Sequence, residues 1–511
     1  MARRRPRAPR PGDAPHAIGF DEALRTWLRV AAQSFGGPAA QIAVMHRILV
    51  EEKRWIGEER FLHALSYCML LPGPEAQQLA TYLGWLLHRT PGGLAAGLLF
   101  VLPGFLSILA LSLVYAAWGR LPAVEGIFFG IKPAVLALVL EALLRIGRRA
   151  LGHPALVAVA AASFVALFAF GVPFPWIVGT AAALGLVGAR AAPEIFRGPR
   201  PAAPAAGTAI IDALLEREIP EHARPSRSRT VRTAALWLGI WLGPVVALRV
   251  GLGPDSVFSR IAVFFSQLAV VTFGGAYAVL SYLAQQAVGV YGWLDAREML
   301  DGLGMAETTP GPLIQVVQFV GFLAAWRNPG ALPPWVAGIL AALLTTWVTY
   351  APCFLWIFVG APWIERLRES RWLRGALSAI TAAVVGVIGN LALWFSLHAL
   401  FAEVSLLRLG PLALPVPEWR TLDPAAAAIA LGAALATLRY HVGILPLLGA
   451  CAALGGAWRL LGASLRSPAA RCARPLGACQ EGCVVERGLR GRFFGHGEGW
   501  NRKGVHGKRP G

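Results

Sequence analysis

Two short helix-breaking motifs in this sequence each occur twice, with the same separation between them. Ser34–Gly37 (SFGG) recurs as Thr272–Gly275 (TFGG), and Leu71–Pro74 (LPGP) recurs as Thr309–Pro312 (TPGP). Proline lacks a backbone donor and glycine tolerates open backbone, so both interrupt helices. A helix that restarts after such a break presents unpaired N–H groups and the positive end of its dipole, which can hold an anion. The expected restart positions are Ala39, Glu75, Tyr277 and Leu313.

The chemistry expected from these motifs is reversible binding of an oxyanion. The backbone donors would be the N–H groups of Gly36, Gly37, Gly73, Gly274, Gly275 and Gly311. The residues expected to break the helices are Pro38, Pro72, Pro74, Pro310 and Pro312.

Polar side chains beside the breaks could add donors for the same anion. Gln77 and Gln315 each lie three residues past a Pro-Gly-Pro motif, about one turn inside the restarted helix. Ser34, Thr272 and Thr309 offer hydroxyl groups at the same level. Each of these side chains could instead hydrogen-bond to a neighbouring helix.

Three ionisable residues lie inside or beside apolar segments. Lys132 could supply a positive charge to the site, or it could pair with Glu125 or extend to the membrane surface. Glu75 and Glu307 flank the two Pro-Gly-Pro motifs. A carboxylate repels a dianion, so these two are expected to carry a coupling ion, most simply a proton. Capping of its own helix is the alternative role for Glu75.

The sequence carries no motif of an enzyme. It has no nucleophile elbow and no Walker loop, so neither catalysis nor a cofactor is expected. The cysteines near the C-terminus (Cys472, Cys479 and Cys483) match no common zinc spacing, so no metal site is expected.

The composition places these residues in a membrane. Of the 511 residues, 56% are hydrophobic and only 15% are charged, and the mean hydropathy is +0.56. Soluble chains carry about 25% charged residues. Apolar blocks of roughly 17–25 residues can cross a bilayer, and they must do so as helices because their backbone groups have to pair internally. The stronger blocks are Leu94–Ala117, Val124–Leu144, Leu151–Phe170, Ala234–Val250, Val336–Gly360 and Ala376–Leu400, and the weaker ones are Trp176–Gly188, Ala425–Leu438 and Val442–Leu461. We therefore expect an all-α, multi-pass protein of the inner (plasma) membrane.

Further matches indicate two homologous halves. Trp55 matches Trp293 and Gln77 matches Gln315 in the same register, and Gly84 matches Gly321 after a slip of one residue. Phe100–Pro103 also corresponds to Val348–Pro352 once a longer loop is allowed. Interrupted segments at matching positions in two halves are the best pointer in a sequence to a transporter's binding site. The alternative is that the breaks only allow close packing of helices.

The basic residues predict that the second half is inverted. Segment 46–60 carries four Lys or Arg residues against one in its counterpart 282–301, whereas segment 118–123 carries one against four in 361–374. Basic residues mark the cytoplasmic side, so a bias that changes sides indicates an inverted repeat with re-entrant, broken helices. The net charge of +19 then reports orientation, and no nucleic acid partner is expected. The expected organisation is a basic cytoplasmic arm (1–19), a first membrane domain (20–190), a basic linker (191–232), a connecting transmembrane helix (233–256), a second membrane domain (257–465) and a basic tail (466–511).

These motifs resemble those of the chromate ion transporter (CHR) family, in its long two-domain branch. Phe35–Pro38, Trp55, Pro72–Pro74 with Gln77, Gly84 and Phe100–Gly104 resemble its first domain, and Thr272–Gly275, Trp293, Thr309–Pro312 with Gln315, and Gly321 resemble its second. The resemblance spans about 20–188 and 257–400. One departure is that Pro38 is replaced by Ala276 in the second half.

The resemblance implies export of chromate from the cytoplasm, driven by an ion gradient and giving chromate resistance. It also implies sulfate as a competitor or alternative cargo. The sequence leaves open a transporter for sulfate or another oxyanion, an anion channel, and a homodimeric assembly.

Overall fold

The computed structural model describes residues 18–119, 121–196, 225–273, 276–363, 371–410 and 412–466. The chain divides into two compact units, Met1–Ala463 and Ser464–Gly511, and the first unit is described below. Most of the predicted basic arm, linker and tail lies outside the described residues, as do Gly274 and Gly275.

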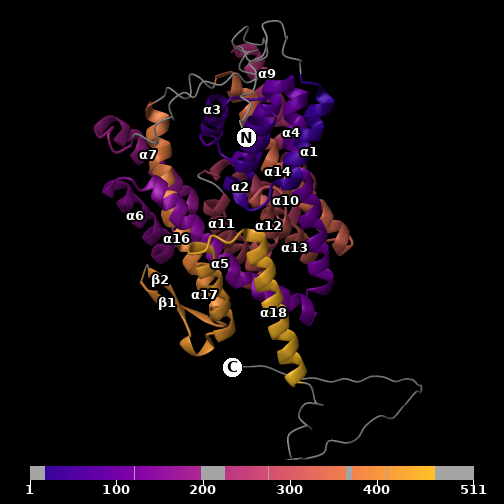
Figure 1. Ribbon diagram of the computed structural model, residues 1–511, viewed down its shortest axis with the longest axis vertical. Coiled ribbons are helices and arrows are strands. Elements are labelled where there is room, and N and C mark those ends of the chain that lie inside the picture. Colours follow the sequence, from indigo (N-terminus) through magenta and orange to yellow (C-terminus); the bar gives the residue numbers. More distant parts are fainter. Residues whose placement is uncertain are drawn as a thin grey trace, which may run out of the picture. The chain divides into compact units, whose positions relative to one another are not determined.

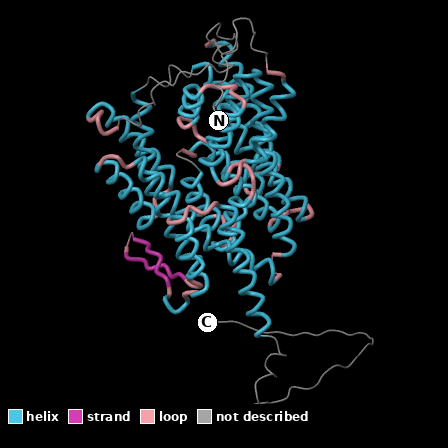
Figure 2. Tube along the Cα trace, in the orientation of Figure 1, coloured by secondary structure: helices cyan, strands magenta, loops and turns pink. Residues whose placement is uncertain are grey.

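Helices make up nearly all of the described chain, as Figures 1 and 2 show. The first half runs through α1 (Phe20–Gln33), α2 (Gly37–His46), the π-helix η1 (Arg47–Glu52), α3 (Glu58–Cys68), α4 (Glu75–Trp118), α5 (Pro122–Ala150), α6 (Pro154–Phe170) and α7 (Phe174–Ala191). Helix α9 (Arg227–Gly251) follows the first half and precedes the second in the sequence.

The second half begins with a similar order of elements. It runs through α10 (Val257–Val271), α11 (Ala276–Ala284), the π-helix η3 (Gln285–Val290), α12 (Ala296–Thr308), η4 (Leu313–Gln315), α13 (Val316–Arg327), α14 (Pro334–Gly360), η5 (Ala361–Trp363) and α16 (Arg371–Leu400). After α16 come the strands β1 (Val404–Leu409) and β2 (Leu412–Pro417), η6 (Trp419–Thr421), α17 (Pro424–Leu438) and α18 (Ile444–Arg466).

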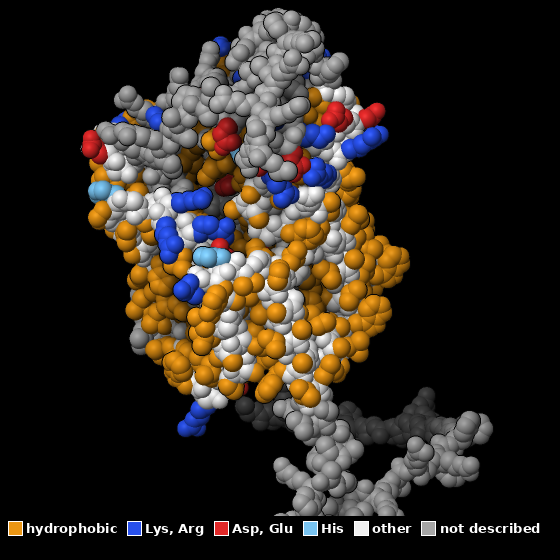
Figure 3. All heavy atoms as spheres, in the orientation of Figure 1, with side chains coloured by type: hydrophobic (Ala, Val, Ile, Leu, Met, Phe, Trp, Pro, Cys, Tyr) orange, Lys and Arg blue, Asp and Glu red, His pale blue; other side chains and the backbone are white. Residues whose placement is uncertain are grey.

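The prediction of an all-α, multi-pass membrane protein is confirmed. Each predicted membrane segment lies in a helix, to within three residues at its ends. Within the described ranges, seven helices are long and apolar enough to cross a membrane: α4, α5, α7, α9, α14 with η5, α16 and α18. Apolar side chains cover most of the face in Figure 3, whereas charged ones gather in its upper part. An exposed apolar surface of this extent suits contact with lipid.

The backbone at the ends of η1 and η3 shows the same hydrogen bonds in both halves. The N–H of Trp55 donates to the carbonyl of Leu49 (2.9 Å), and the N–H of Trp293 donates to that of Ala287 (2.8 Å). These bonds close the two π-helices, which occupy equivalent positions in the sequence. The π-helices were not predicted; helices of this kind are rare and are often found near functional sites.

Helix α4 consists of two helices joined at a kink. His88 and Arg89 leave the helical region, and Arg89 has a positive φ of 56°. In the second half the corresponding stretch is the two separate helices α13 and α14.

The central helices are the most deeply buried. Helix α14 packs against α4, α9, α10 and α13, and α16 packs against α5, α6 and α7. Every residue of α13 from Val316 to Ala325 is buried. At the breaks, Ser34, Gly37, Thr309 and Gly311 are buried, and irregular backbone is tolerated inside a membrane protein.

A two-stranded hairpin between α16 and α17 was not predicted. Strands β1 and β2 pair antiparallel, from Val404 opposite Pro417 to Leu409 opposite Leu412. The hairpin turns at Gly410, whose φ of +60° suits glycine. The two strands are too short to cross a membrane, so a search for long apolar segments does not detect them.

Candidate functional site

The glycines of the breaks adopt backbone conformations that other residues rarely reach. The φ angles of Gly36, Gly37, Gly73 and Gly311 are +82°, +78°, +126° and +101°. Helices α2, α4, α11 and η4 begin at or next to these breaks, within two residues of the predicted restart positions. The local sequence therefore determines where each helix stops and restarts.

The breaks of the two halves are joined by reciprocal hydrogen bonds. The N–H of Gly73 donates to the carbonyl of Thr272 (2.8 Å), and the N–H of Gly311 donates to the carbonyl of Ser34 (2.8 Å). Each Pro-Gly-Pro motif thus contacts the residue just before the Phe-Gly-Gly motif of the other half. Two of the N–H groups predicted to bind the anion are occupied by these bonds in this structure.

Each Pro-Gly-Pro glycine also packs tightly against a long helix of the other half. A Cβ atom on Gly73 would lie 2.8 Å from Sγ of Cys353 in α14. A Cβ atom on Gly104 in α4 would lie 2.7 Å from the carbonyl oxygen of Pro310. Both contacts follow a proline inside the long helix, Pro352 and Pro103 respectively. The glycines are needed here for space as well as for conformation.

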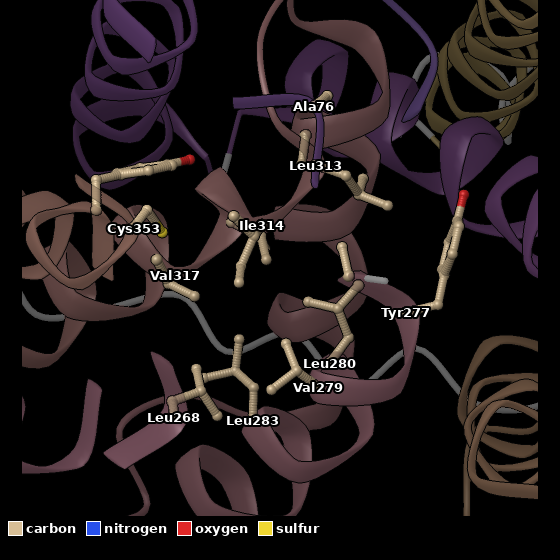
Figure 4. Close-up of a cluster of buried hydrophobic side chains, with 14 of the residues drawn as sticks. Ala76, Leu268, Tyr277, Val279, Leu280, Leu283, Leu313, Ile314, Val317 and Cys353 are labelled. Carbon is tan, nitrogen blue, oxygen red and sulfur yellow. The ribbon is translucent and has the colours of Figure 1, made fainter. Parts of the chain in front are cut away.

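A small cavity of about 10 Å³, room for about one water molecule, lies where the restarted helices converge. We call it the pocket. It is lined by Pro38, Gln41, Pro74, Glu75, Ala76, Ala276, Pro312, Leu313 and Ile314. These residues come from the first turns of α2, α4, α11 and η4. Figure 4 labels three of them, Ala76 from α4 and Leu313 and Ile314 from η4.

Helix N-termini provide the positive side of the pocket. No described side chain caps α2, α4 or η4, so first-turn N–H groups are left for another acceptor. None of the described lining residues is Lys or Arg. An anion here would be held by backbone dipoles rather than by a cationic side chain.

Gln41 and Glu75 are the only polar side chains among the described lining residues. Gln41 is 1% exposed, and its Nε2 donates to the carbonyl of Gly311 at 2.5 Å. Its Oε1 is buried without a hydrogen-bond partner among the described residues. Gln41 was not predicted because the prediction relied on residues that match between the halves. The equivalent position in the second half is Val279, which is apolar. A signal was available, since Gln41 is a polar residue one turn past Gly37 in a largely apolar segment.

The two predicted glutamines after the Pro-Gly-Pro motifs do not line the pocket. Nε2 of Gln77 donates to Oγ1 of Thr81 in its own helix (3.0 Å). Gln315 accepts from the hydroxyl of Tyr350 (2.7 Å) and donates to Gln318 (2.5 Å). Gln315 therefore belongs to a buried network between η4, α13 and α14.

The predicted hydroxyl groups also turn back onto their own helices. Oγ of Ser34 donates to the carbonyl of Val30 (2.7 Å), and Oγ1 of Thr272 donates to that of Leu268 (2.6 Å). Thr309 makes a longer bond to Ala306 (3.5 Å). The structure thus places these hydroxyls beside the breaks but not in the pocket lining.

The two predicted carboxylates differ in their surroundings. Glu75 lines the pocket. Glu307, at the end of α12, is 1% exposed, and its Oε1 accepts from the hydroxyl of Tyr277 (2.7 Å) while its Oε2 has no partner among the described residues. The ring of Tyr277 extends from α11 away from the apolar cluster in Figure 4. Its hydroxyl lies 4.0 Å from where a Cβ on Gly37 would be, so Glu307 is linked to the Phe-Gly-Gly break.

Lys132 forms an ion pair between the halves. Its Nζ lies 3.1 Å from Oδ1 of Asp301 in α12, and both side chains are largely buried. The hydroxyl of Tyr115 in α4 donates to Oδ2 of Asp301 (2.9 Å). Glu125, considered above as a partner of Lys132, pairs with Arg459 of α18 instead (3.3 Å). Lys132 does not line the pocket, and Asp301 was not identified from the sequence.

The arrangement gathers helix N-termini, Gln41 and Glu75 around one small cavity, which must widen before it can take a tetrahedral anion. No cluster of three or more His, Cys, Asp or Glu side chains that could hold a metal ion occurs among the described residues.

Comparison with known proteins agrees with this architecture. The profile of a family described as "Chromate transporter" matches residues 22–186 and 259–456. A chromate transport protein of Pseudomonas aeruginosa is 31% identical over 382 residues, which are 73% of this chain and 80% of that protein. A probable chromate transport protein of Synechococcus elongatus is 27% identical over 376 residues, 73% of this chain and 84% of that protein. A chromate transport protein of Cupriavidus metallidurans is 27% identical over 362 residues, 71% of this chain and 79% of that protein. No solved structure matches the chain significantly.

Proposed function

This chain belongs to the chromate transporter family, and we propose that it is a secondary active transporter that exports chromate across the cytoplasmic membrane. Export would lower the cytoplasmic chromate concentration and so confer resistance. Sulfate-like oxyanions are the competing or alternative cargo. The observation that carries the proposal is the pocket between the restarted helices, within a chain whose relatives are named for chromate transport.

The pocket suits an oxyanion because its positive side consists of helix N-termini. Four helix starts contribute to the lining, and each presents backbone N–H groups and a positive dipole end. Backbone donors hold a tetrahedral anion at several oxygens without the strong grip of a buried cation. A transporter needs this balance, since it must release its cargo on the other side.

Alternating access is supported by the reciprocal contacts between the halves. Gly73 contacts Thr272 and Gly311 contacts Ser34 in the same way, as a two-fold axis between the halves would produce. We infer that the halves are inverted repeats that rock against each other around the pocket. Breaking and remaking these two bonds is the local event that such a motion requires.

Coupling to a proton gradient is assigned to Glu75 and Glu307. Glu75 lines the pocket, so a proton on its carboxylate and an anion beside it affect each other's binding. Glu307 is buried at the adjoining break with one oxygen unpaired among the described residues. For an inward proton gradient to drive export, a carboxylate must take up a proton from outside after the anion has left and release it to the cytoplasm before the next anion binds.

The test is uptake of radiolabelled chromate into everted membrane vesicles that contain the full chain. With an imposed proton gradient, chromate should accumulate above its external concentration, and excess sulfate should reduce the rate. Equilibration without accumulation would indicate a channel or facilitator. Accumulation of labelled sulfate but not of chromate would leave the transport mechanism in place and overturn the choice of cargo.

A further inference from the structure

The polar side chains of the pocket are both hydrogen-bond acceptors. Gln41 has its Nε2 engaged by the carbonyl of Gly311, so the atom left for a ligand is Oε1. Oε1 is buried and has no partner among the described residues. A buried amide oxygen without a donor is costly, and a donor on the ligand would satisfy it. The carboxylate of Glu75 is a second acceptor in the same lining.

A fully deprotonated oxyanion cannot satisfy these acceptors. It carries only oxygen acceptors, so it matches the helix N-termini but repels Oε1 of Gln41 and an ionised Glu75. The described lining residues include no Lys or Arg to offset a second negative charge. A tetrahedral oxyanion that keeps one proton has one charge fewer and one O–H donor, and it complements both sides of the pocket.

We propose that the pocket selects the monoprotonated form of its oxyanion, with Gln41 Oε1 accepting the hydrogen bond from the ligand's O–H. This inference rests on the proposed function, because it assumes that the pocket takes a tetrahedral oxyanion. Hydrogen chromate is a weak acid, so part of the chromate near neutral pH carries a proton. Sulfate carries none at that pH. Gln41 thereby favours hydrogen chromate over sulfate, which has a similar shape, since a site built around a hydrogen bond binds a ligand that lacks it more weakly.

Arsenate and selenate make a matched pair of probes for this inference. They are tetrahedral and similar in size, but at neutral pH arsenate retains a proton and selenate does not. Comparing them at one pH also keeps the surrounding titratable groups in the same state for both ligands. These groups are Glu75 on α4, Cys68 on α3, and the pair of Tyr277 and Glu307 from α11 and α12.

The experiment is equilibrium dialysis of radiolabelled chromate with the purified full-length protein at neutral pH. Arsenate should displace chromate at about a tenfold lower concentration than selenate, the effect of one hydrogen bond to a desolvated acceptor. Gln41→Met removes the acceptor and should abolish this difference. Equal displacement by the two anions in the unaltered protein would overturn the proposal, and so would a preference for arsenate that survives Gln41→Met.

Gln78→Met is the matched control. Gln78 is also fully buried, donates through Nε2 to the carbonyl of a Pro-Gly-Pro motif (Pro72, 2.7 Å), and has an unpaired Oε1 among the described residues. It does not line the pocket. Gln78→Met should therefore retain the preference for arsenate, and loss of the preference in both variants would overturn the assignment to Gln41.

Binding and transport separate the two proposals. If the protein binds chromate with the expected preference but vesicles do not accumulate chromate, the export function fails and the inference stands. If vesicles accumulate chromate but arsenate and selenate displace it equally, the inference fails alone. If the purified protein does not bind chromate, both are overturned.

Discussion

The N–H of Gly311 in the second half donates to the carbonyl of Ser34 in the first half at 2.8 Å. The equivalent bond, from Gly73 to Thr272, has the same length and runs in the opposite sense between the halves. The helix breaks are thus part of the contact between the halves as well as of the pocket. Substitutions at the breaks should affect stability and transport together.

Gly311→Ala should destabilise the protein. An alanine at a φ of +101° is strained, and its Cβ would lie 3.1 Å from Cα of Gly104, so we expect a loss of about 1–3 kcal/mol. Gly104→Ala should have a comparable cost of about 1–3 kcal/mol through its clash with Pro310, without any change in φ preference. The measurement is the thermal unfolding midpoint of the purified protein in detergent.

Gly243→Ala is the control for these two variants. Gly243 lies in α9, and a Cβ there would meet no atom within 4 Å. It should leave the midpoint unchanged or raise it slightly, because alanine is the better helix former. A midpoint lowered equally by all three substitutions would show that the breaks are no more sensitive than any other glycine.

Lys132→Met should be strongly destabilising because it leaves Asp301 buried without its counter-charge. Removing one partner of a buried ion pair typically costs about 3–5 kcal/mol. The double variant Lys132→Met with Asp301→Asn should be more stable than the sum of the single effects predicts, by at least about 1 kcal/mol. Strict additivity, together with weaker chromate binding by Lys132→Met alone, would instead favour a direct role of Lys132 in holding the anion.

Tyr277→Phe should cost about 1–3 kcal/mol, since it leaves the buried Glu307 carboxylate with neither oxygen paired to a described residue. Tyr115→Phe should cost less, because Asp301 keeps Lys132 when the hydroxyl is removed. The two variants are compared by thermal unfolding. A larger effect at Tyr115 would contradict this ranking of the two carboxylates.

Glu75→Gln should uncouple transport from the proton gradient. An amide cannot release a proton, so chromate exchange between the two sides should persist while gradient-driven accumulation is lost. Exchange and accumulation are measured in the same vesicles. Glu125→Gln provides the control, because Glu125 pairs with Arg459 at an exposed position and should leave accumulation intact. Unchanged accumulation in Glu75→Gln would remove this residue from the coupling step.

Sequence reasoning succeeded where a local rule decides the structure. Glycine and proline determine the backbone near them, so the restart of α4 at Glu75 and of η4 at Leu313 could be predicted to the residue. Apolar length likewise predicted the membrane helices. Both kinds of signal lie within a few residues of the feature that they predict.

Sequence reasoning failed where two interacting residues are distant in the chain. Asp301 and Lys132 are brought together by packing of α12 on α5, which no local pattern encodes. Gln41 was missed because its counterpart Val279 is apolar, and a search based on repeats ignores positions at which the halves differ. The hydroxyls of Ser34 and Thr272 lie beside the breaks but bond to carbonyls of their own helices, as Ser and Thr in helices often do.

The reciprocal bonds of Gly73 and Gly311 bear on how the chain is made. During synthesis the first half enters the membrane before Thr272 and Gly311 have left the ribosome. Until they arrive, the N–H of Gly73 and the carbonyl of Ser34 lack the partners that they have in the finished protein. An unpaired backbone group within the bilayer is costly, so the newly inserted first half is an unfinished intermediate. Its breaks become ordered only when the second half has been inserted beside it, which makes the completed pocket a late product of biogenesis.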